Sequence, residues 1–292
     1  MTTLGMIGLG RTGLPIAQNL IARGHDVIGF RRSGSPDLLR AGGRVATHVR
    51  ELAAADVILS VLPSASALDD VMAGLLAALE PRHTVIELSS YPLAVKEHHR
   101  ARLAERGAAL LDGEISGTPA MTAARASVFL IAGEQARSEA ALAICRDATD
   151  HVFYAGGFGA ATKLKLVANH LVAVHTAAAA EALLLVERAG LDVALAIDVL
   201  GLGAGASTML RARAPSMAAR RFVDPAPGPV AMLSAYLPPI HALAAACDAP
   251  VPLFSIAAEL FDTALAEGRH AQDIACVIDV LAQRTPAKGP HS

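Results

Sequence analysis

Three glycines near the start of the chain have the spacing of a turn that holds a dinucleotide. They form the pattern G-x-G-x-x-G in "MIGLGRTGLPIAQNL". The first glycine permits a tight turn, the second lets the backbone approach a pyrophosphate, and the third lets a helix pack closely on a strand. The amino end of that helix offers unpaired N–H donors to the anion. The motif indicates a bound dinucleotide cofactor, and the expected cofactor loop is Gly8, Leu9, Gly10, Arg11, Thr12 and Gly13.

The second strand-like segment ends in two arginines instead of an acid. In proteins that use NAD, an Asp or Glu at this point binds the ribose 2′-hydroxyl. Here "HDVIGF" is followed by Arg31, Arg32 and Ser33. An acid would repel a 2′-phosphate, whereas a guanidinium fork and a serine hydroxyl donate hydrogen bonds to it. This pattern favours NADP; the alternative is that the two arginines are merely solvated in a loop.

The elements that must position these residues follow from the hydrophobic pattern. Short apolar runs alternate with helical patterns through the first half of the chain, which is typical of βαβ units. We therefore predict an α/β fold with an amino-terminal Rossmann domain and a mostly parallel sheet. The expected strands are "LGMIG", "DVIGF", "DVILSVL", "HTVIELS", "AALLDGE", "SVFLIAG" and "HVFYAGGFG".

The pattern changes after residue 159. Residues 160–190 are rich in Ala and Leu and predict one long helix between the domains, with Gly190 as its carboxyl-terminal stop. The patterns beyond it are helical. We therefore expect an NADP-binding Rossmann domain at 1–159 and an all-helical domain for substrate binding and dimerisation at 160–292.

Composition and charge exclude several classes of protein. The chain has 292 residues, 53% of them hydrophobic, and a formal net charge of −2. Without a long run of Lys or Arg, neither nucleic acid nor a membrane surface is expected as a partner. The amino terminus indicates a strand rather than a signal peptide, and the apolar segment "LVAVHTAAAAEALLLV" is interrupted by His175 and Glu181. These features predict a cytoplasmic protein.

Cysteines and histidines give little sign of special chemistry. Cys145, Cys247 and Cys276 are odd in number and far apart, which predicts buried thiols in a reducing compartment. His98 and His99 are adjacent in a helical stretch and do not share a helix face. No metal site is expected.

Five segments, taken together and in this order, resemble the β-hydroxyacid dehydrogenase family, which includes 3-hydroxyisobutyrate dehydrogenases and glyoxylate/succinic semialdehyde reductases. They are "GLGRTGLPIAQNLIARGH", "VLPSASALDDVM", "ELSS", "DGEISGTP" and "GAATKLKLVANH". The resemblance covers nearly the whole chain. It implies a Rossmann domain, a long interdomain helix, a helical domain that often forms a homodimer interface, and a small-molecule substrate bound between the domains.

The resemblance also implies where cofactor and substrate bind. Residues implied to lie along the cofactor are Leu62, Pro63 and Ser90. A loop implied to hold the substrate's carboxylate consists of Ser116, Gly117 and Thr118.

The catalytic lysine of the family is followed four residues later by an asparagine. Lys165 and Asn169 have this spacing and share a helix face, whereas Lys163 has Val167 at that offset. By resemblance, Lys165 donates a proton to the carbonyl oxygen during reduction and removes it during oxidation, while Asn169 orients the substrate. Partial burial would bring the pKa of Lys165 towards the working pH. The alternative is that Lys165 extends along the helix and Asn169 binds a backbone group.

Two departures from the family pattern concern the substrate. The segment "DGEISGT" has a charged Glu114 and a bulky Thr118 where the family reads roughly D-A-P-V-S-G-G. Residues 235–237, "AYL", stand where the family often has Lys-Asp-Leu in its substrate-closing segment. Tyr236 and His241 are candidate replacement contacts; the alternative is that both are packing residues.

Together these features predict an NADP-dependent oxidoreductase that interconverts a small hydroxy acid and its aldehyde or keto acid. An imine reductase acting on C=N bonds is one alternative, although such enzymes typically carry Asp or Tyr at the position of Lys165. A non-catalytic NADP-binding module is the other, although such a protein would typically have lost this lysine.

Overall fold

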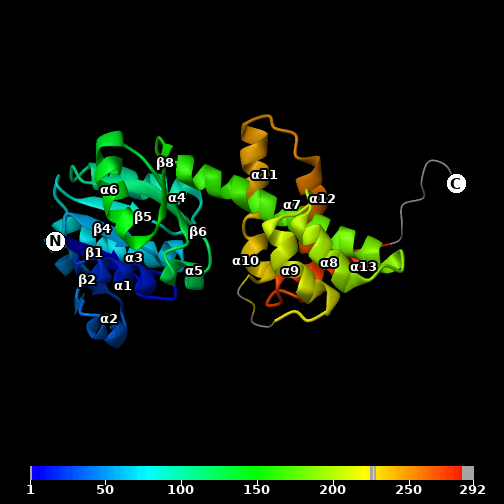
Figure 1. Ribbon diagram of the computed structural model, residues 1–292. Coiled ribbons are helices and arrows are strands. Elements are labelled where there is room, and N and C mark those ends of the chain that lie inside the picture. The colour runs from blue at the N-terminus through cyan, green and yellow to red at the C-terminus, as the bar shows by residue number, and fades with distance from the viewer. Residues whose placement is uncertain (1, 224–225, 227, 285–292) are drawn as a thin grey trace. The chain divides into compact units, whose positions relative to one another are not determined.

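The computed structural model describes residues 2–223, 226 and 228–284 (Figure 1). The chain forms two compact units that divide between Lys165 and Leu166. The division falls inside the long helix rather than at its first residue, because the first turn of that helix is bonded to the sheet of the amino-terminal unit through Thr162 and Lys165.

An eight-stranded sheet forms the centre of the amino-terminal unit. Its strands are β1 (Thr3–Ile7), β2 (Asp26–Phe30), β3 (Arg44–Val45), β4 (Val57–Ser60), β5 (Thr84–Glu87), β6 (Ala109–Ser116), β7 (Val128–Ala132) and β8 (His151–Gly156). Their order is β3-β2-β1-β4-β5-β6-β7-β8, and all neighbours are parallel except β6 and β7. The expected α/β fold and its seven strands are confirmed. The pattern missed β3, because two residues are too short to show a period.

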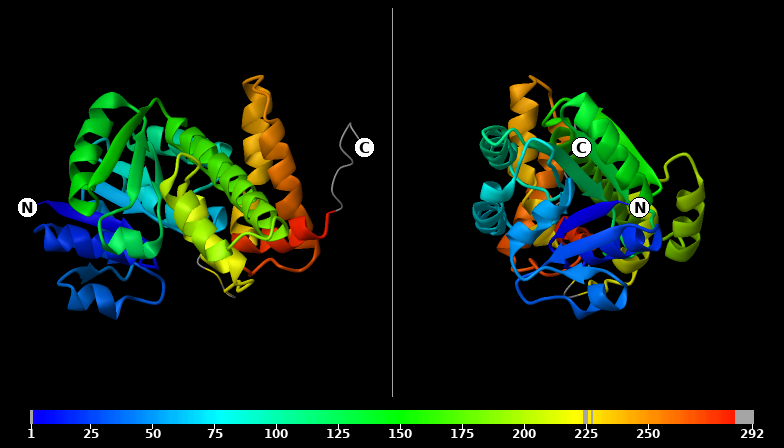
Figure 2. Two further views of the ribbon diagram at one scale, coloured as in Figure 1. Left: turned by 45° about the vertical axis from the view of Figure 1, so that its right-hand side comes forward. Right: turned by 90° about the vertical axis from the view of Figure 1, so that its left-hand side faces the viewer.

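Helices cover both faces of this sheet (Figures 1 and 2). Leu4 and Met6 of β1 pack in one core, with α1 (Gly13–Ala22) and α6 (Gln135–Ala148). Ile7 packs in the other core, with α3 (Ala65–Leu75) and α4 (Leu93–Ala104). This alternation is the two-residue period of a strand buried on both sides. The helical segments of this unit are α1 (Gly13–Ala22), α2 (Pro36–Arg40), η1 (Val49–Ala54), α3 (Ala65–Leu75), η2 (Leu76–Ala78), α4 (Leu93–Ala104), α5 (Pro119–Ala123) and α6 (Gln135–Ala148).

The carboxyl-terminal unit is helical, as expected. Its elements, with the long helix that leads into it, are α7 (Ala160–Arg188), α8 (Val193–Leu202), α9 (Thr208–Ala218), α10 (Val230–Ser234), α11 (Leu237–Ala246), α12 (Pro252–Ala266), η3 (Ile274–Cys276) and α13 (Val277–Ala282). Phe254 and Phe261 of α12 are fully buried in its core beside Ala180 and Leu183 of α7. Gly190 stops α7 with a φ of +71°, a conformation that glycine adopts without strain.

The long helix α7 contains the apolar segment in which His175 and Glu181 stand. By length and composition it could cross a membrane, even though His175 and Glu181 interrupt its apolar sequence. Within the carboxyl-terminal unit, however, Ala173, Ala180 and Leu183 of α7 are fully buried in the protein core. The helix is therefore a core helix of this unit.

The cysteines are only partly as expected. Cys145 and Cys276 are buried free thiols, and burial raises the pKa of Cys145 to about 12. Cys247 is exposed, so its assignment to the core is wrong. It follows the last residue of α11, at the turn where the chain leaves that helix for α12.

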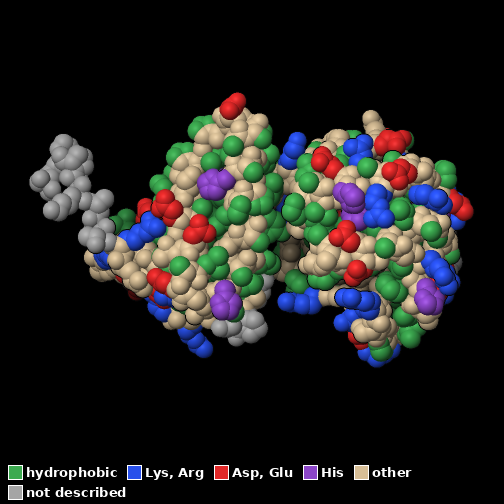
Figure 3. Space-filling model, turned by 180° about the vertical axis from the view of Figure 1, so that it is seen from behind, with side chains coloured by type: hydrophobic (Ala, Val, Ile, Leu, Met, Phe, Trp, Pro, Cys, Tyr) green, Lys and Arg blue, Asp and Glu red, His purple; other side chains and the backbone are tan. Residues whose placement is uncertain are grey.

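Charged side chains of both signs are mixed on the face of the amino-terminal unit that Figure 3 shows. That face presents no extended area of positive charge, in keeping with the small net charge of the chain.

Candidate active site

The glycine loop after β1 has the geometry of a phosphate cradle. Gly8 has a φ of +84°, and a Cβ there would lie 2.0 Å from the carbonyl oxygen of Val61. A Cβ on Gly13 would lie 1.9 Å from the carbonyl oxygen of Gly8. A Cβ on Gly10 would meet no atom within 4 Å among the residues described. The first and third glycines are thus required by the fold itself, while Gly10 leaves its space open for a ligand.

The amino end of α1 lies at this loop. In this fully described helix, Thr12 at the N-cap makes no side-chain capping bond and the first turn holds no acidic residue. The backbone N–H groups and the helix dipole are therefore available to an anion. The loop follows β1, whose neighbours β2 and β4 lie on opposite sides, so the strand order reverses at β1. Sheets of this kind bind dinucleotides at the point of reversal. These features fit a dinucleotide cofactor.

Arg31, Arg32 and Ser33 follow β2 beside the glycine loop, and all three are exposed. The Arg31 guanidinium donates a hydrogen bond of 3.5 Å to the carbonyl oxygen of Leu9. Arg32 lies 4.0 Å from Asp70, a solvent-exposed pair that constrains its side chain little. Both guanidinium groups can thus turn towards a phosphate near the loop.

The loop after β4 is held by residues that the sequence did not indicate. The backbone N–H of Leu62 donates to Ser89 Oγ over 2.8 Å, and the Tyr91 hydroxyl donates to the Leu62 carbonyl over 3.0 Å. Pro63 and Ser90 are exposed at these two loops. Ser89 and Tyr91 act through hydrogen bonds between distant segments, for which neither spacing nor composition gives a signal.

The segment expected to hold a carboxylate turns sharply after β6. Ser116 is the last residue of β6, and Gly117 has a φ of +147°, where a Cβ would lie 2.9 Å from Ser127 Oγ. Thr118 is the N-cap of α5 and accepts a hydrogen bond of 3.2 Å from Met121 N–H. The Thr118 hydroxyl thus has a structural task that the sequence did not predict.

A buried ionic cluster lies under the end of β6. The Lys96 ammonium donates to Asp112 Oδ1 over 2.9 Å, to the Gly113 carbonyl over 2.8 Å and to Glu114 Oε1 over 3.0 Å. The Thr162 hydroxyl donates to Asp112 Oδ1 over 2.7 Å. Burial lowers the pKa of Lys96, but the charges of Glu114 and Asp112 outweigh this and raise it. All three donors of the ammonium therefore have acceptors, as a buried charge requires.

The sequence around Lys96 gives little sign that this lysine is buried. It lies in "KEHHRARLAERG", which looks like a solvated helix. Yet Lys96, His99 and Leu103 are the buried residues of α4, and their i, i+3, i+7 spacing marks one helix face. The same arrangement explains His99, whose Nε2 lies 2.8 Å from Asp69 Oδ1. Within the described ranges no group of three His, Cys, Asp or Glu side chains is placed to hold a metal ion.

Lys165 reaches the end of β6 from the first turns of α7. Its ammonium donates a hydrogen bond of 3.0 Å to the carbonyl oxygen of Ile115. Burial lowers the pKa of Lys165, and the negative charge of Glu114 opposes that effect. Lys163, two residues earlier, is exposed. The structure thus places one of the two competing lysines against the sheet and the other in solvent.

Asn169 follows one turn later on α7 and is buried. Among the residues that the structure describes, none accepts a hydrogen bond from its Nδ2. A buried amide without a partner is costly. A bound ligand that accepts from Nδ2 would satisfy it.

Tyr236 and His241 lie in the carboxyl-terminal unit. Tyr236 is half-buried against the core and precedes α11. The His241 ring lies 4.8 Å from the ring of Phe254, and His170 stacks on the same ring at 5.1 Å. Both candidates therefore have packing contacts within this unit.

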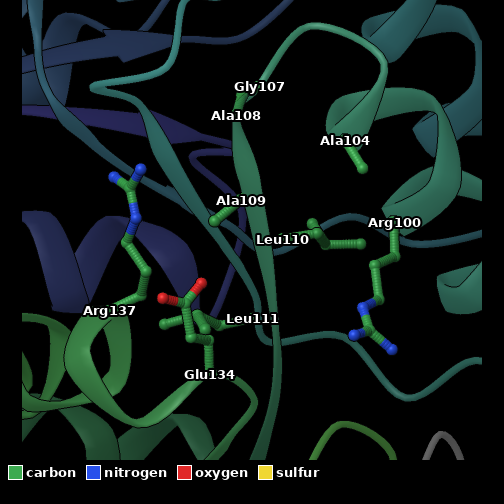
Figure 4. Close-up of a pocket in the computed structure, with 9 residues that line it drawn as sticks. All are labelled: Arg100, Ala104, Gly107, Ala108, Ala109, Leu110, Leu111, Glu134 and Arg137. Atoms are coloured by element: carbon green, nitrogen blue, oxygen red, sulfur yellow. The ribbon is translucent and has the colours of Figure 1, made fainter.

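Figure 4 shows a pocket of about 260 Å³ at α4, β6 and α6. None of the expected site residues lines it. Its Arg137 donates to Thr84 Oγ1 over 3.3 Å, and the Arg100 guanidinium lies over the Phe158 ring at 4.7 Å. Both arginines already have partners in the protein, and Glu134, the third charged residue of the lining, is exposed.

Two family models match the chain. Residues 3–156 match the NAD binding domain of 6-phosphogluconate dehydrogenase. Residues 159–281 match the model described as NAD-binding of NADP-dependent 3-hydroxyisobutyrate dehydrogenase.

Individual proteins are similar over most of the chain. The NAD-dependent L-serine dehydrogenase of Pseudomonas aeruginosa is 31% identical over 222 residues, 74% of each chain. The L-threonate dehydrogenase of Cupriavidus necator is 29% identical over 290 residues, 95% of each. The structure of Mycobacterium tuberculosis 3-hydroxyisobutyrate dehydrogenase with L-serine superposes with a TM-score of 0.84 at 27% identity, covering 96% of this chain and 99% of that one.

Proposed function

This chain belongs to the β-hydroxyacid dehydrogenase family, and from that premise we propose that it is an NADP-dependent enzyme with Lys165 as its general acid and base. Its reaction interconverts a small hydroxy acid and the corresponding aldehyde or keto acid. The observation that carries the proposal is the half-buried Lys165 amine, 3.0 Å from the Ile115 carbonyl and one helical turn before Asn169.

Lys165 performs the proton transfer in both directions. A nicotinamide cofactor held at the glycine loop would supply the hydride for reduction of the carbonyl carbon and would accept it in oxidation. In reduction, the Lys165 ammonium gives a proton to the carbonyl oxygen, so that the product is an alcohol rather than a free alkoxide. In oxidation, the neutral amine takes the hydroxyl proton. A lysine whose pKa is lowered by burial suits both tasks.

The remaining site residues orient the substrate and hold the cofactor. The buried Asn169 amide, with an unused Nδ2 donor, binds a substrate oxygen. The turn formed by Ser116, Gly117 and Thr118 binds the carboxylate. Leu62, Pro63 and Ser90 line the cofactor beyond the glycine loop.

NADP is proposed over NAD because of Arg31, Arg32 and Ser33. These exposed residues follow β2, where an acid would bind a ribose hydroxyl. Two guanidinium groups there suit a 2′-phosphate. The L-serine dehydrogenase relative is NAD-dependent, whereas the family model that matches residues 159–281 describes an NADP-dependent enzyme.

The substrate proposed is a short hydroxy acid. L-serine, L-threonate and 3-hydroxyisobutyrate, named for the relatives, all carry a carboxylate and a hydroxyl on a short carbon chain. The loss of the Lys-Asp-Leu sequence at residues 235–237 leaves Tyr236 and His241 to set the preference among them.

A cytoplasmic homodimer is proposed as the working form. The apolar helix α8 has no buried residue in the single chain. Leu195, Val199 and Leu202 on it are 61%, 58% and 90% exposed. A second copy would remove this apolar surface from water.

The direct test is turnover with a substrate panel. Purified protein is assayed with NADP+ and L-serine, L-threonate or 3-hydroxyisobutyrate, and with NADPH and the matching aldehydes, glyoxylate or a cyclic imine. Oxidation of a hydroxy acid with NADP+, at a higher kcat/KM for the cofactor than with NAD+, is expected. Turnover of imines alone would instead establish an imine reductase, and NADPH binding without any turnover a non-catalytic module.

A further inference from the structure

Glu114 lies in β6 directly before Ile115, whose carbonyl oxygen accepts the hydrogen bond of Lys165, and its Oε1 accepts a bond of 3.5 Å from the Thr162 hydroxyl, three residues before Lys165 on α7. Its Oε1 accepts from the Lys96 ammonium over 3.0 Å, and its Oε2 accepts from the hydroxyl of Ser90. The side chain is 1% exposed. Burial raises the pKa of Glu114, whereas the Lys96 charge and the hydrogen bonds from Ser90 and Lys96 act in the opposite direction and favour its carboxylate form.

With Asp112 and Glu114 both ionised, the charges of this region balance when Lys165 is protonated. The Lys96 ammonium is surrounded by two carboxylates, those of Asp112 and Glu114. One excess negative charge remains, and the Lys165 ammonium compensates it. Since the neighbourhood is buried, an uncompensated charge there is costly.

The other ionisable groups named near the cluster supply neither the negative charge of Glu114 nor the positive charge of Lys165. On α7, Lys163 is exposed. On β5, burial raises the pKa of Glu87, which favours its neutral form. Burial also raises the pKa of Tyr91, so its phenol stays neutral. Burial lowers the pKa of Lys165, and the negative charge of Glu114 opposes that effect.

We propose that Glu114 is a positioning residue for the reaction: held in place by Lys96 and Ser90, its buried carboxylate stabilises the ammonium form of Lys165 and so keeps the proton donor for carbonyl reduction available at higher pH. This inference rests on the proposed role of Lys165. It also gives a task to the charged residue by which this chain departs from the family's D-A-P-V-S-G-G loop.

Glu114→Gln tests the proposal, because glutamine keeps the size and the acceptor oxygen but removes the charge. The matched control is Glu97→Gln, which removes an exposed carboxylate on the same helix as Lys96. The rate of reduction falls at high pH as Lys165 loses its proton. Without the Glu114 charge, this falling limb of the pH profile moves to lower pH. On that limb kcat falls roughly threefold to tenfold below wild type. At low pH, where the ammonium is present in both proteins, kcat stays close to wild type.

A second readout does not need turnover. Trace labelling with acetic anhydride, followed by mass spectrometry of the Lys165 peptide, reports the neutral amine as a function of pH. In Glu114→Gln the labelling curve moves to lower pH, while in Glu97→Gln it stays. An unchanged labelling curve in Glu114→Gln would overturn the inference. If the labelling curve moves but the falling limb of the pH profile of reduction does not, the assignment of Lys165 as proton donor would be overturned instead.

If Glu114→Gln fails to fold, the triple variant Lys96→Met, Asp112→Asn and Glu114→Gln removes the buried ionic cluster as a unit, which proteins tolerate better than breaking it. The same shift is expected there, because the excess negative charge beside Lys165 is gone. An unshifted labelling curve in the triple variant would count against the proposal as well.

Discussion

The Lys165 ammonium donates a hydrogen bond of 3.0 Å to the carbonyl oxygen of Ile115. This contact fixes the first turns of α7 against the carboxyl end of β6, in the strand that also carries Asp112 and Glu114. It gives the amine a defined position without occupying all of its donors, since an ammonium has three. A substrate carbonyl oxygen can therefore accept a hydrogen bond from another N–H of the ammonium.

The pH dependence of the two directions should differ in sign. Reduction needs the Lys165 ammonium, so its rate falls as pH rises through the lowered pKa of this group. Oxidation needs the neutral amine, so its rate rises over the same range. Initial rates of both reactions across a pH series check this. Parallel pH profiles for the two directions would argue against a single acid and base.

The two glycines of the cofactor loop should respond differently to the same substitution. Gly10→Ala places a methyl group in open space, so the free protein keeps its melting temperature but binds NADPH weakly. Gly8→Ala places its Cβ against the Val61 carbonyl at a positive φ, and costs about 2 kcal/mol or more of folding free energy. Thermal melts with and without NADPH separate the two effects. Full NADPH binding by Gly10→Ala would mean that the loop does not hold the pyrophosphate.

Arg31 and Arg32 should determine cofactor preference. The double variant Arg31→Ala with Arg32→Ala should lose at least about tenfold in kcat/KM for NADPH, because hydrogen bonds to a charged phosphate are lost. The kcat/KM for NADH should change little. Arg50→Ala, which removes another exposed arginine of the same unit, is the control. Equal losses for the two cofactors would show that these arginines do not read the 2′-phosphate.

The exposed face of α8 should hold two chains together. Leu195→Glu with Val199→Glu introduces charge into an apolar surface and should shift the protein from dimer to monomer in sedimentation velocity. Leu39→Glu, at a residue 58% exposed in the other unit, should leave the dimer intact. A variant at α8 that sediments as wild type would place the dimer contact elsewhere.

Much of the fold was predictable because its signals are local. The alternation of short apolar runs with helical patterns located β1, β2 and β4 to β8. The glycine spacing located the turn after β1. The long helix followed from composition and ended at Gly190, as predicted. These features depend on neighbours within a few residues along the chain.

What escaped prediction depends on contacts between distant segments. Lys96 and Asp112 are 16 residues apart, and Thr162 joins them from 50 residues further on. A charged helix gives no direct sign that one of its lysines will be buried. Glu114 was noticed only as a departure from a family pattern, and its partners became visible only in the folded chain.

The most direct test of the account compares Lys165→Ala with Lys163→Ala in single-turnover reduction of the substrate identified in the panel, at saturating NADPH. Lys165→Ala should lower the rate roughly a hundredfold to ten-thousandfold while NADPH binding stays unchanged, and Lys163→Ala should react like wild type. A Lys165→Ala protein that transfers hydride at the wild-type rate would contradict the account.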